Sequence, residues 1–475
     1  LEFSAGNAGP SARTIGTPAL AKNVIATGAS LNNRDDLFIY TEGQETMADF
    51  SSRGPCEDGR IKPDVVAPGT WIASLRSIFA DDNNAWAEIS QNYMYQGGTS
   101  QSGPHVSGAA AVFVQYYREN FGGTPSPALV KAALINSAVD MLDEFGTAPA
   151  PNNEEGWGRI DLTRIIDSDR DVVFIEQTNV LSTGASYETA VVVEDPSEPL
   201  KVTLTYTDEP GFPGAIPALV NDLDLEVIAP DGTLYRGNRF SNGESIPNAA
   251  TPDNINNVEG VFLFEPLVGE YRIRVFARNV PEDARIDTPA VDQDFALVIS
   301  GAFLPPGQSV VYLDRTYYRV PDRIHVGVVD RDRAGSPFVS VTLTSTTEPG
   351  GQNLLLFPET PNGVFTNSIV TATGAPAADN QLQIAHGDLI QARYQDDSTG
   401  ALRIASAEAD LVPPIISAVT VTNRFGRATI LWNTDELTDS RVDYGTTAAL
   451  GLSTGDLELT TSHTIGLENL IPLAT

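Results

Sequence analysis

The chain has 475 residues, of which 41% are apolar, so it can form about three or four domains with filled cores. It carries 62 acidic and 29 basic residues, a formal net charge of -33, which argues against a nucleic-acid partner because phosphates would be repelled. Its single cysteine, Cys56, excludes an intrachain disulfide, and no apolar run approaches the ~20 residues that span a bilayer.

The acidic surplus fits a soluble extracellular protein, a salt-adapted host or carboxylates that carry calcium, and a well-solvated acidic surface is the favoured interpretation. The chain begins abruptly, because Leu1 and the two residues after it run straight into the sequence SAGN, like the end of an opened core strand. We therefore expect that the natural N-terminus lies further upstream.

The first third of the chain has an α/β pattern. Residues 23–28 and 64–69 are short apolar runs that end in turn residues, as buried strands do. Apolar residues then recur at three- and four-residue spacing in residues 100–120 and 127–138, which predicts two helices. The sequence GWG at residues 156–158 is typical of a turn. We assign this first domain to residues 1–163.

After about residue 167 the helical period gives way to alternating polar and apolar residues, which is typical of strands. The sequences PPG at 305–307 and PP at 413–414 mark linkers. We therefore predict three all-β domains, at residues 164–304, 305–412 and 413–475. Their clearest strands are expected at residues 201–206, 222–227, 271–275, 295–299, 324–328, 339–343, 428–432 and 441–444.

One segment carries features that suit a nucleophile: residues 97–108, with the sequence GGTSQSGPHVSG. Ser100 follows a glycine pair and opens the predicted helix. Glycines permit a close backbone approach, and a helix N-terminus offers unpaired N–H groups with a partial positive charge. Both features would stabilise the oxyanion that forms when a serine attacks a carbonyl. Taken alone, however, a serine at a helix start is more often an N-cap.

Three segments together resemble the subtilisin-like serine proteases, or subtilases. GTS followed by PHVSG resembles the nucleophile segment of that family, SAGN at residues 4–7 resembles its oxyanion-hole motif, and FSSRGP with KPDVVAPG at residues 50–69 resembles the strand region before the nucleophile. They occur in the family's order, and the sequence at 156–160 looks like the end of its catalytic domain. The resemblance covers residues 1–163 and implies a subtilisin-like α/β parallel-sheet fold there.

Carried over residue by residue, the resemblance makes Ser100 the nucleophile and Asn7 an oxyanion donor, with the Ser100 N–H as the second donor. Gly98 and Thr99 would then contact the substrate. The alternative is that Asn7 is an ordinary turn residue and that Gly98 and Thr99 are ordinary loop residues. The joint match of three motifs makes that alternative unattractive.

The sequence departs from the family in one serious respect. Subtilases order their triad as Asp, then His, then Ser, and the first two motifs would lie upstream of Asn7, where this sequence begins. His105 lies five residues after Ser100 and so points to another side of the same helix. His325, His386 and His463 fall in the predicted β domains. We therefore expect this chain to be inactive alone, since Ser100 lacks a general base.

The β domains resemble accessory modules of secreted bacterial proteins: a jelly roll at 164–304, an immunoglobulin-like sandwich at 305–412 and a truncated fibronectin type III domain at 413–475. Some relatives bind calcium in the jelly roll, and Asp222 and Asp224 are candidate ligands because they share one strand face with Glu226. A solvated face is favoured over a cation site, for want of a ligand loop.

The sequence therefore predicts a secreted serine endopeptidase that cleaves protein or peptide substrates, in a multidomain chain of one α/β domain and several β-sandwich domains. No cofactor is required for the chemistry, and calcium would serve only as a structural ion. Surface or matrix contacts would fall to the β domains. The alternative function is that of a non-catalytic extracellular adhesin or matrix protein on a protease-derived scaffold.

Overall fold

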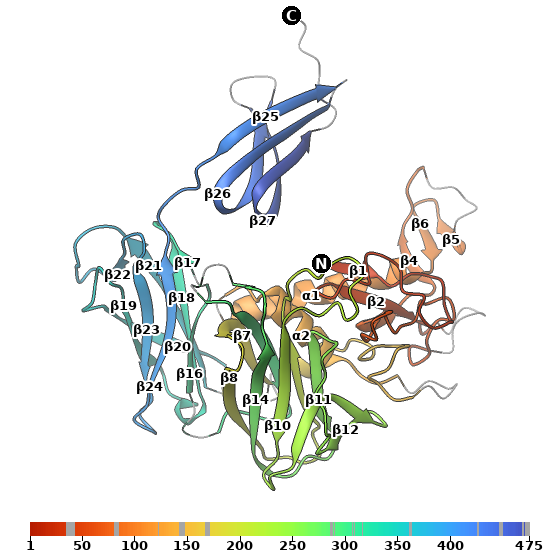
Figure 1. Ribbon diagram of the computed structural model, residues 1–475, viewed down its shortest axis with the longest axis horizontal. Coiled ribbons are helices and arrows are strands. Elements are labelled where there is room, and N and C mark those ends of the chain that lie inside the picture. The colour runs from red at the N-terminus through yellow and green to blue at the C-terminus, as the bar shows by residue number, and fades with distance from the viewer. Residues whose placement is uncertain are drawn as a thin grey trace, which may run out of the picture.

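A computed structural model of the chain places its elements in four successive groups (Figure 1). It describes every residue except 35–42, 80–84, 122, 142–147, 167–171, 286–287, 289, 306, 308, 316, 361–362, 425–426, 446–449, 468–469 and 471–475. The domain boundaries that we predict at residues 163, 304 and 412 remain predictions, although each falls between the strands of successive groups. None of the described helices is long and apolar enough to cross a membrane.

The first group is built on a parallel sheet with the strand order β1-β2-β3. Its strands are β1 (Glu2–Ser4), β2 (Ile25–Ser30) and β3 (Val65–Pro68). Every residue of β2 and nearly every residue of β3 is buried, which is why the sequence shows them as continuous apolar runs. The two strands predicted at residues 23–28 and 64–69 are therefore confirmed, within two residues.

The two predicted helices are also confirmed, as α1 (Thr99–Phe121) and α2 (Pro127–Ser137). A short third helix, α3 (Thr163–Ile166), closes the group. The Ser126 hydroxyl caps α2 by accepting the Leu129 N–H at 3.1 Å, and Pro127 occupies the first helical position, where it needs no N–H partner. On α1 the buried stripe follows the predicted spacing and consists of Val106, Phe113, Tyr117 and Phe121.

A three-stranded antiparallel sheet between β3 and α1 escaped the sequence analysis. It has the strand order β4-β6-β5 and consists of β4 (Ile72–Leu75), β5 (Ala87–Ser90) and β6 (Tyr93–Gln96). Figure 1 shows this sheet projecting from the body of the molecule as an arm. Most of its side chains are exposed, including Leu75, so it has no apolar face that alternation could reveal.

The second group is a pair of sheets, with strand orders β12-β11-β10-β14-β8 and β13-β9-β15-β7, whose apolar side chains form one core. Its four predicted strands are confirmed in β9, β10, β14 and β15. The strands are β7 (Val172–Leu181), β8 (Ser186–Val193), β9 (Leu200–Thr205), β10 (Asp222–Ile228), β11 (Leu234–Ser241), β12 (Glu244–Pro247), β13 (Val258–Leu263), β14 (Gly269–Asn279) and β15 (Gln293–Ser300).

The third group is one sheet that folds around its own core, in the order β16-β18-β21-β20-β19-β23-β24-β17, with β22 paired to β21. The strands predicted at 324–328 and 339–343 are confirmed in β18 and β19. Its strands are β16 (Ser309–Leu313), β17 (Tyr317–Tyr318), β18 (Arg323–Asp330), β19 (Val339–Thr344), β20 (Gln352–Thr360), β21 (Val364–Ala372), β22 (Gln381–Gln383), β23 (Leu389–Gln395) and β24 (Leu402–Ala409). A 3-10 turn, η2 (Arg331–Arg333), follows β18.

The fourth group is an antiparallel sheet of β25 (Ser417–Arg424), β26 (Arg427–Tyr444) and β27 (Leu452–Leu467). The two strands predicted at 428–432 and 441–444 belong to the same long strand, β26, whose register with β27 shifts between them. In the sequence alone, the irregular stretch between the two segments interrupts the alternating pattern, so one strand is predicted as two.

The first and second groups share a core and hydrogen bonds. The Asn136 amide of α2 donates to the Lys201 carbonyl, the Thr203 hydroxyl and the Val298 carbonyl, each at 3.1 Å. Trp157, which we predicted only as part of a turn, is buried, and its ring meets that of Phe262 edge-on at 5.5 Å. The second group therefore packs as a continuation of the first.

A buried ion cluster holds the parallel sheet to α2. The Asp64 carboxylate accepts a hydrogen bond from the Ala26 N–H at 2.7 Å, pairs with Lys131 of α2 at 3.1 Å and also pairs with Lys62. Burial disfavours the charged carboxylate, but the two ammonium groups outweigh burial, so the pKa of Asp64 is lowered. Burial lowers the pKa of Lys131 to about 8. Each charge in the cluster therefore depends on the others.

Replacing Asp64 by Asn should destabilise the protein by about 3–5 kcal/mol at pH 7, because Asp64→Asn leaves two buried ammonium groups without a counter-charge. The loss should shrink toward pH 9, since buried Lys131, whose pKa is about 8, loses its proton there while the same lysine in the unfolded chain keeps it. Urea unfolding followed by tryptophan fluorescence measures both effects. The control is Asp443→Asn, which removes an exposed pair with Arg441 and should leave the midpoint unchanged. Equal midpoints for the two variants would contradict the importance of the cluster.

Candidate active site

The start of α1 is fixed by glycines that allow neighbouring groups to approach closely. Gly98 has a φ of +145°, and its N–H donates to the Gly69 carbonyl at 2.8 Å, which ties the helix start to the end of β3. A Cβ at Gly97 would lie 2.0 Å from the ring of Trp86 in the arm. Any larger residue at these two positions would therefore displace the helix start, as the sequence analysis expects of the glycine pair.

Asn7 lies directly against the first turn of α1. Its Oδ1 accepts hydrogen bonds from the Thr99 N–H at 2.9 Å and from the Thr99 hydroxyl at 3.0 Å. The two bonds occupy the carbonyl side of the carboxamide and leave its NH₂ group as the side that can donate. Among the described residues nothing accepts from that NH₂ group. The amide is therefore oriented as an oxyanion donor would have to be.

The loop that carries Asn7 is held on both sides. The Ser4 hydroxyl donates to the Thr99 carbonyl at 2.9 Å, and the Gly6 N–H donates to the Thr99 hydroxyl at 3.2 Å. On the other side, the Ser52 N–H donates to the Gly6 carbonyl and the Ser52 hydroxyl accepts the Ala8 N–H. The three segments that carry the family resemblance, far apart in sequence, thus meet at one point.

Ser100 is the second residue of α1, and its side chain is exposed. Its hydroxyl has no hydrogen-bond partner in the described part of the chain. The N–H groups of a first helical turn lack intrahelical partners, and this turn contains no acidic residue to neutralise their partial charge. An incoming carbonyl would therefore meet a hydroxyl, a positive helix end and the Asn7 amide together.

None of the four histidines hydrogen-bonds to Ser100. The His105 ring lies 2.8 Å from the Gln101 carbonyl one turn earlier on α1, on the exposed surface of the helix. His463 is buried in the fourth group, stacked on Trp432 and hydrogen-bonded to Ser440. His325 and His386 lie in the third group. The structure thus brings Asn7 against Thr99, the residue before Ser100, and none of the four histidines hydrogen-bonds there.

The candidate carboxylates on β10 lie in a buried ion-pair array. Asp224 is fully buried and pairs with Arg278, while Glu226 is buried and pairs with Arg274 and Arg236. The favoured expectation of a solvated face is therefore wrong for these two carboxylates, because arginines of β14 and β11 cover them. Within the described ranges, no group of three or more His, Cys, Asp or Glu side chains is arranged to hold a metal ion.

The sequence analysis missed two features of this region. The aromatic base of the arm, where the Trp71 ring meets Trp86 edge-on at 5.2 Å and Tyr95 at 5.8 Å, lies directly before the helix start. Two tryptophans in the stretch that leads up to the glycine pair were an available signal. The Asp64 cluster was also missed, although a lysine and an aspartate on either side of Pro63, just before a buried strand, could have indicated it.

Comparison with known proteins agrees with the geometry of the first group. Residues 1–158 match the model of the subtilase family. The serine protease/ABC transporter B family protein tagA of Dictyostelium discoideum is 30% identical over 300 residues, which cover 55% of this chain and 16% of that protein. Serine protease AprX of Bacillus subtilis (strain 168) is 37% identical over 143 residues, 30% of each chain.

A third relative and one solved structure extend the comparison. The minor extracellular protease Vpr of Bacillus subtilis (strain 168) is 36% identical over 126 residues, which cover 26% of this chain and 14% of that protein. A solved structure titled S41 psychrophilic protease is 25% identical and covers 34% of this chain and 47% of that one, with a TM-score of 0.24, too slight a likeness to bear on the fold. The chain spans 16%, 30% and 14% of the three relatives. Residues 1–158 thus resemble the subtilase family, and all three relatives are named as proteases.

Proposed function

We propose that the protein is a subtilisin-like serine endopeptidase whose nucleophile is Ser100. The observation that carries the proposal is the pair of hydrogen bonds from Thr99 to the Asn7 carbonyl oxygen, because they fix the Asn7 amide next to the residue before Ser100 and leave its NH₂ group to donate. The match of residues 1–158 to the subtilase family supports the same chemistry.

In the proposed reaction the Ser100 Oγ loses its proton to a base and bonds to the carbonyl carbon of a peptide. The oxygen of that carbonyl takes the negative charge, which the Asn7 NH₂ group and the Ser100 N–H stabilise. Collapse expels the amine, which takes up the proton, and leaves an ester on Ser100. Water then hydrolyses the ester and restores the hydroxyl. Gly98 and Thr99 would line the path of the substrate backbone.

We propose that the base, and the Asp that orients it, come from sequence that precedes Leu1 in the parent protein. Two observations support an additional segment there. In the described sheet β1 is an edge strand, paired only with β2. The side of α1 next to it exposes apolar and small residues, including Pro104, Gly108 and Val112. Alone, the 475-residue chain would then be inactive.

The competing function of the whole protein is adhesion or matrix binding, and it is favoured by one observation: within the described part of the chain, no histidine hydrogen-bonds to Ser100. We place the protease first because the Asn7 amide is held in position, which a non-catalytic scaffold would not need. Protein or peptide substrates and an extracellular location follow from the protease proposal, and the extracellular relative Vpr supports the latter. Reading the gene upstream of Leu1 for Asp and His motifs separates the two functions.

A phosphonylating active-site serine reagent should label the full parent protein at Ser100, and Ser100→Ala should abolish the label. The 475-residue chain should label weakly or not at all, because without a base the hydroxyl stays neutral. Intact-protein mass spectrometry measures the labelled fraction. The matched control is Ser107→Ala, an exposed serine on the same helix, which should label like the wild type. Strong labelling of the 475-residue chain would show that a base is present in it.

In the parent protein, Asn7→Leu should lower kcat by about 10²–10³-fold with little change in KM, which is the cost of losing one oxyanion donor as measured within this family. The reason is that the amide contacts the oxygen only after it becomes charged. A chromogenic peptide substrate gives both constants. Asn7→Asp should be at least as damaging, since a carboxylate repels the oxyanion. A variant that raised KM alone would place Asn7 in ground-state binding instead.

Calcium at Asp222 and Asp224 remains a proposal, and the pH dependence of stability tests it. Burial, reinforced by the Asp224 carboxylate, raises the pKa of Asp222 to about 7. The folded state therefore binds more protons than the unfolded state between about pH 4 and pH 7, so this group lowers stability as pH rises through that window. Without an ion, Asp222→Asn should match the wild type at pH 4 and melt higher at pH 8.

A bound calcium ion would reverse this order. Millimolar CaCl₂ would then raise the melting temperature of the wild type at pH 8 but not that of Asp222→Asn. Differential scanning calorimetry with and without EDTA distinguishes the two outcomes. If neither calcium nor EDTA changes the melting temperature of the wild type, no calcium ion is bound there. The pairing with arginines then accounts for these carboxylates without a metal.

A further inference from the structure

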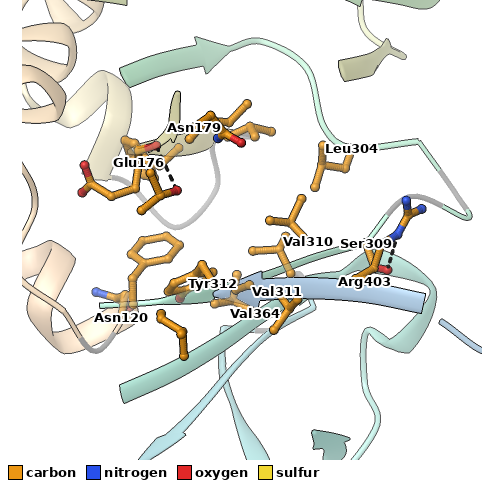
Figure 2. Close-up of a pocket in the computed structure, with 18 of the residues that line it drawn as sticks. Asn120, Glu176, Asn179, Leu304, Ser309, Val310, Val311, Tyr312, Val364 and Arg403 are labelled. Carbon is orange, nitrogen blue, oxygen red and sulfur yellow. Dashed lines mark hydrogen bonds between the residues drawn. The ribbon is translucent and has the colours of Figure 1, made fainter. Parts of the chain in front are cut away.

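A cavity of about 710 Å³ lies where the first three groups of elements meet, far from Ser100 (Figure 2). Its walls come from the last turns of α1, from β7, from β16 and from β24. Tyr116 is the first residue of α1 to line it, sixteen residues after Ser100, or about 24 Å along the helix axis. It is therefore separate from the proposed active site.

The wall is mainly apolar, and its aromatic rings form a continuous surface. Phe121 stacks on Tyr117 at 4.9 Å, meets Phe174 of β7 edge-on at 5.3 Å and lies 6.5 Å from Tyr312 of β16. Figure 2 shows Val310, Val311 and other aliphatic side chains continuing this surface. A guest would thus meet ring faces and branched aliphatic groups on most sides, which suits a flat apolar body.

The charged side chains at the cavity wall are already engaged. The two Glu176 oxygens accept the Ser126 N–H at 3.1 Å and the Gln177 N–H at 2.7 Å. Burial raises the pKa of Glu176, which favours its neutral form. Arg403 lies against the Ser309 hydroxyl at 3.4 Å, the contact drawn in Figure 2.

The remaining charges at the wall follow the same pattern. Arg331 lies over the Phe303 ring at 3.4 Å, and Arg315 pairs with Asp314 and Asp322. Glu359 accepts a hydrogen bond from the Thr366 hydroxyl at 2.7 Å. A charged guest would have to displace one of these contacts or enter without a counter-charge, so the wall selects an uncharged guest.

The wall also carries a neutral polar group that is not hydrogen-bonded. The Tyr312 hydroxyl is buried and has no hydrogen-bond partner among the described residues. Burial raises the pKa of Tyr312, so the hydroxyl is neutral and can both donate and accept. An unpaired buried hydroxyl costs free energy that a guest with one hydroxyl or carbonyl group would recover.

We propose that this cavity binds an uncharged amphipathic small molecule, with an aromatic or aliphatic body and one hydroxyl or carbonyl group that hydrogen-bonds to Tyr312. The cavity volume is in the range of known small-molecule sites, which commonly lie between domains. Leu402 and Ile404, 45% and 46% exposed, mark the side by which the guest enters. The site does not depend on the proposed peptidase activity.

The test uses the 475-residue chain and a matched pair of probes, 4-propylphenol and propylbenzene. A purely apolar cavity would prefer propylbenzene, because burying an unpaired hydroxyl is unfavourable. We expect the opposite: one site per chain by isothermal titration calorimetry, with a Kd at least tenfold lower for 4-propylphenol. In Tyr312→Phe the difference should fall below twofold, while Tyr93→Phe, an exposed tyrosine of the arm, should behave like the wild type.

Two filling variants show where the probe binds. Val310→Trp on β16 and Asn179→Trp on β7 each place an indole in the cavity, and each should weaken 4-propylphenol binding at least tenfold. Circular dichroism verifies that each variant folds, and one folded variant is enough. The proposal is overturned if the wild type binds neither probe, if propylbenzene binds equally well, or if a folded filling variant binds 4-propylphenol like the wild type.

Discussion

The buried carboxylate of Asp64 is the constraint on which the first group of elements depends. Its oxygens reach the Ala26 N–H of β2 and the Lys131 ammonium of α2, while its own carbonyl accepts the Trp157 N–H at 2.9 Å. One residue thus joins two strands, a helix and the tryptophan whose ring packs on the second group. Such a charge is stable only with its ionic partners in place, so the packing of α2 on the sheet depends on the pairing of Asp64 with Lys62 and Lys131.

The same strand sets the position of the proposed nucleophile. β3 ends at Pro68, and the next residue, Gly69, accepts the Gly98 N–H and so fixes where α1 begins. Thr99 then reaches across to Asn7, on a loop that follows β1. Backbone hydrogen bonds therefore connect the ion cluster to the start of α1. The strands of the arm lie between Gly69 and Gly98 in the chain, and the Gly98–Gly69 hydrogen bond closes that segment. This explains how an inserted sheet with exposed side chains is tolerated beside the site.

The sequence was sufficient for the features that short-range physics determines. The three- and four-residue spacing predicted α1 and α2, and the apolar runs predicted β2 and β3. The resemblance named Asn7 as a site residue, and Asn7 does hydrogen-bond to Thr99, the residue before Ser100. The sequence was not sufficient where residues far apart in the chain determine burial. Asp224 and Glu226 do share one face of β10, as predicted. That face is not solvated, however, because arginines up to 54 positions away along the chain, such as Arg278, cover it. The arm lacks a buried face, and the cavity exists only because three groups of elements converge, so neither leaves a local pattern.

The two ends of α1 are held by different forces, which gives the β domains a role beyond spacing. The first turn is held by hydrogen bonds to Asn7 and Gly69, whereas Phe113, Tyr117 and Phe121 anchor the other end in apolar contacts with β7 and β16. Apolar burial tolerates small shifts, but hydrogen bonds of 2.9 Å do not. A helix anchored at its far end needs only those few bonds to set the direction of its first residue. The second and third groups thereby add apolar contacts that help to hold α1, although none of their described side chains hydrogen-bonds to Asn7 or Ser100.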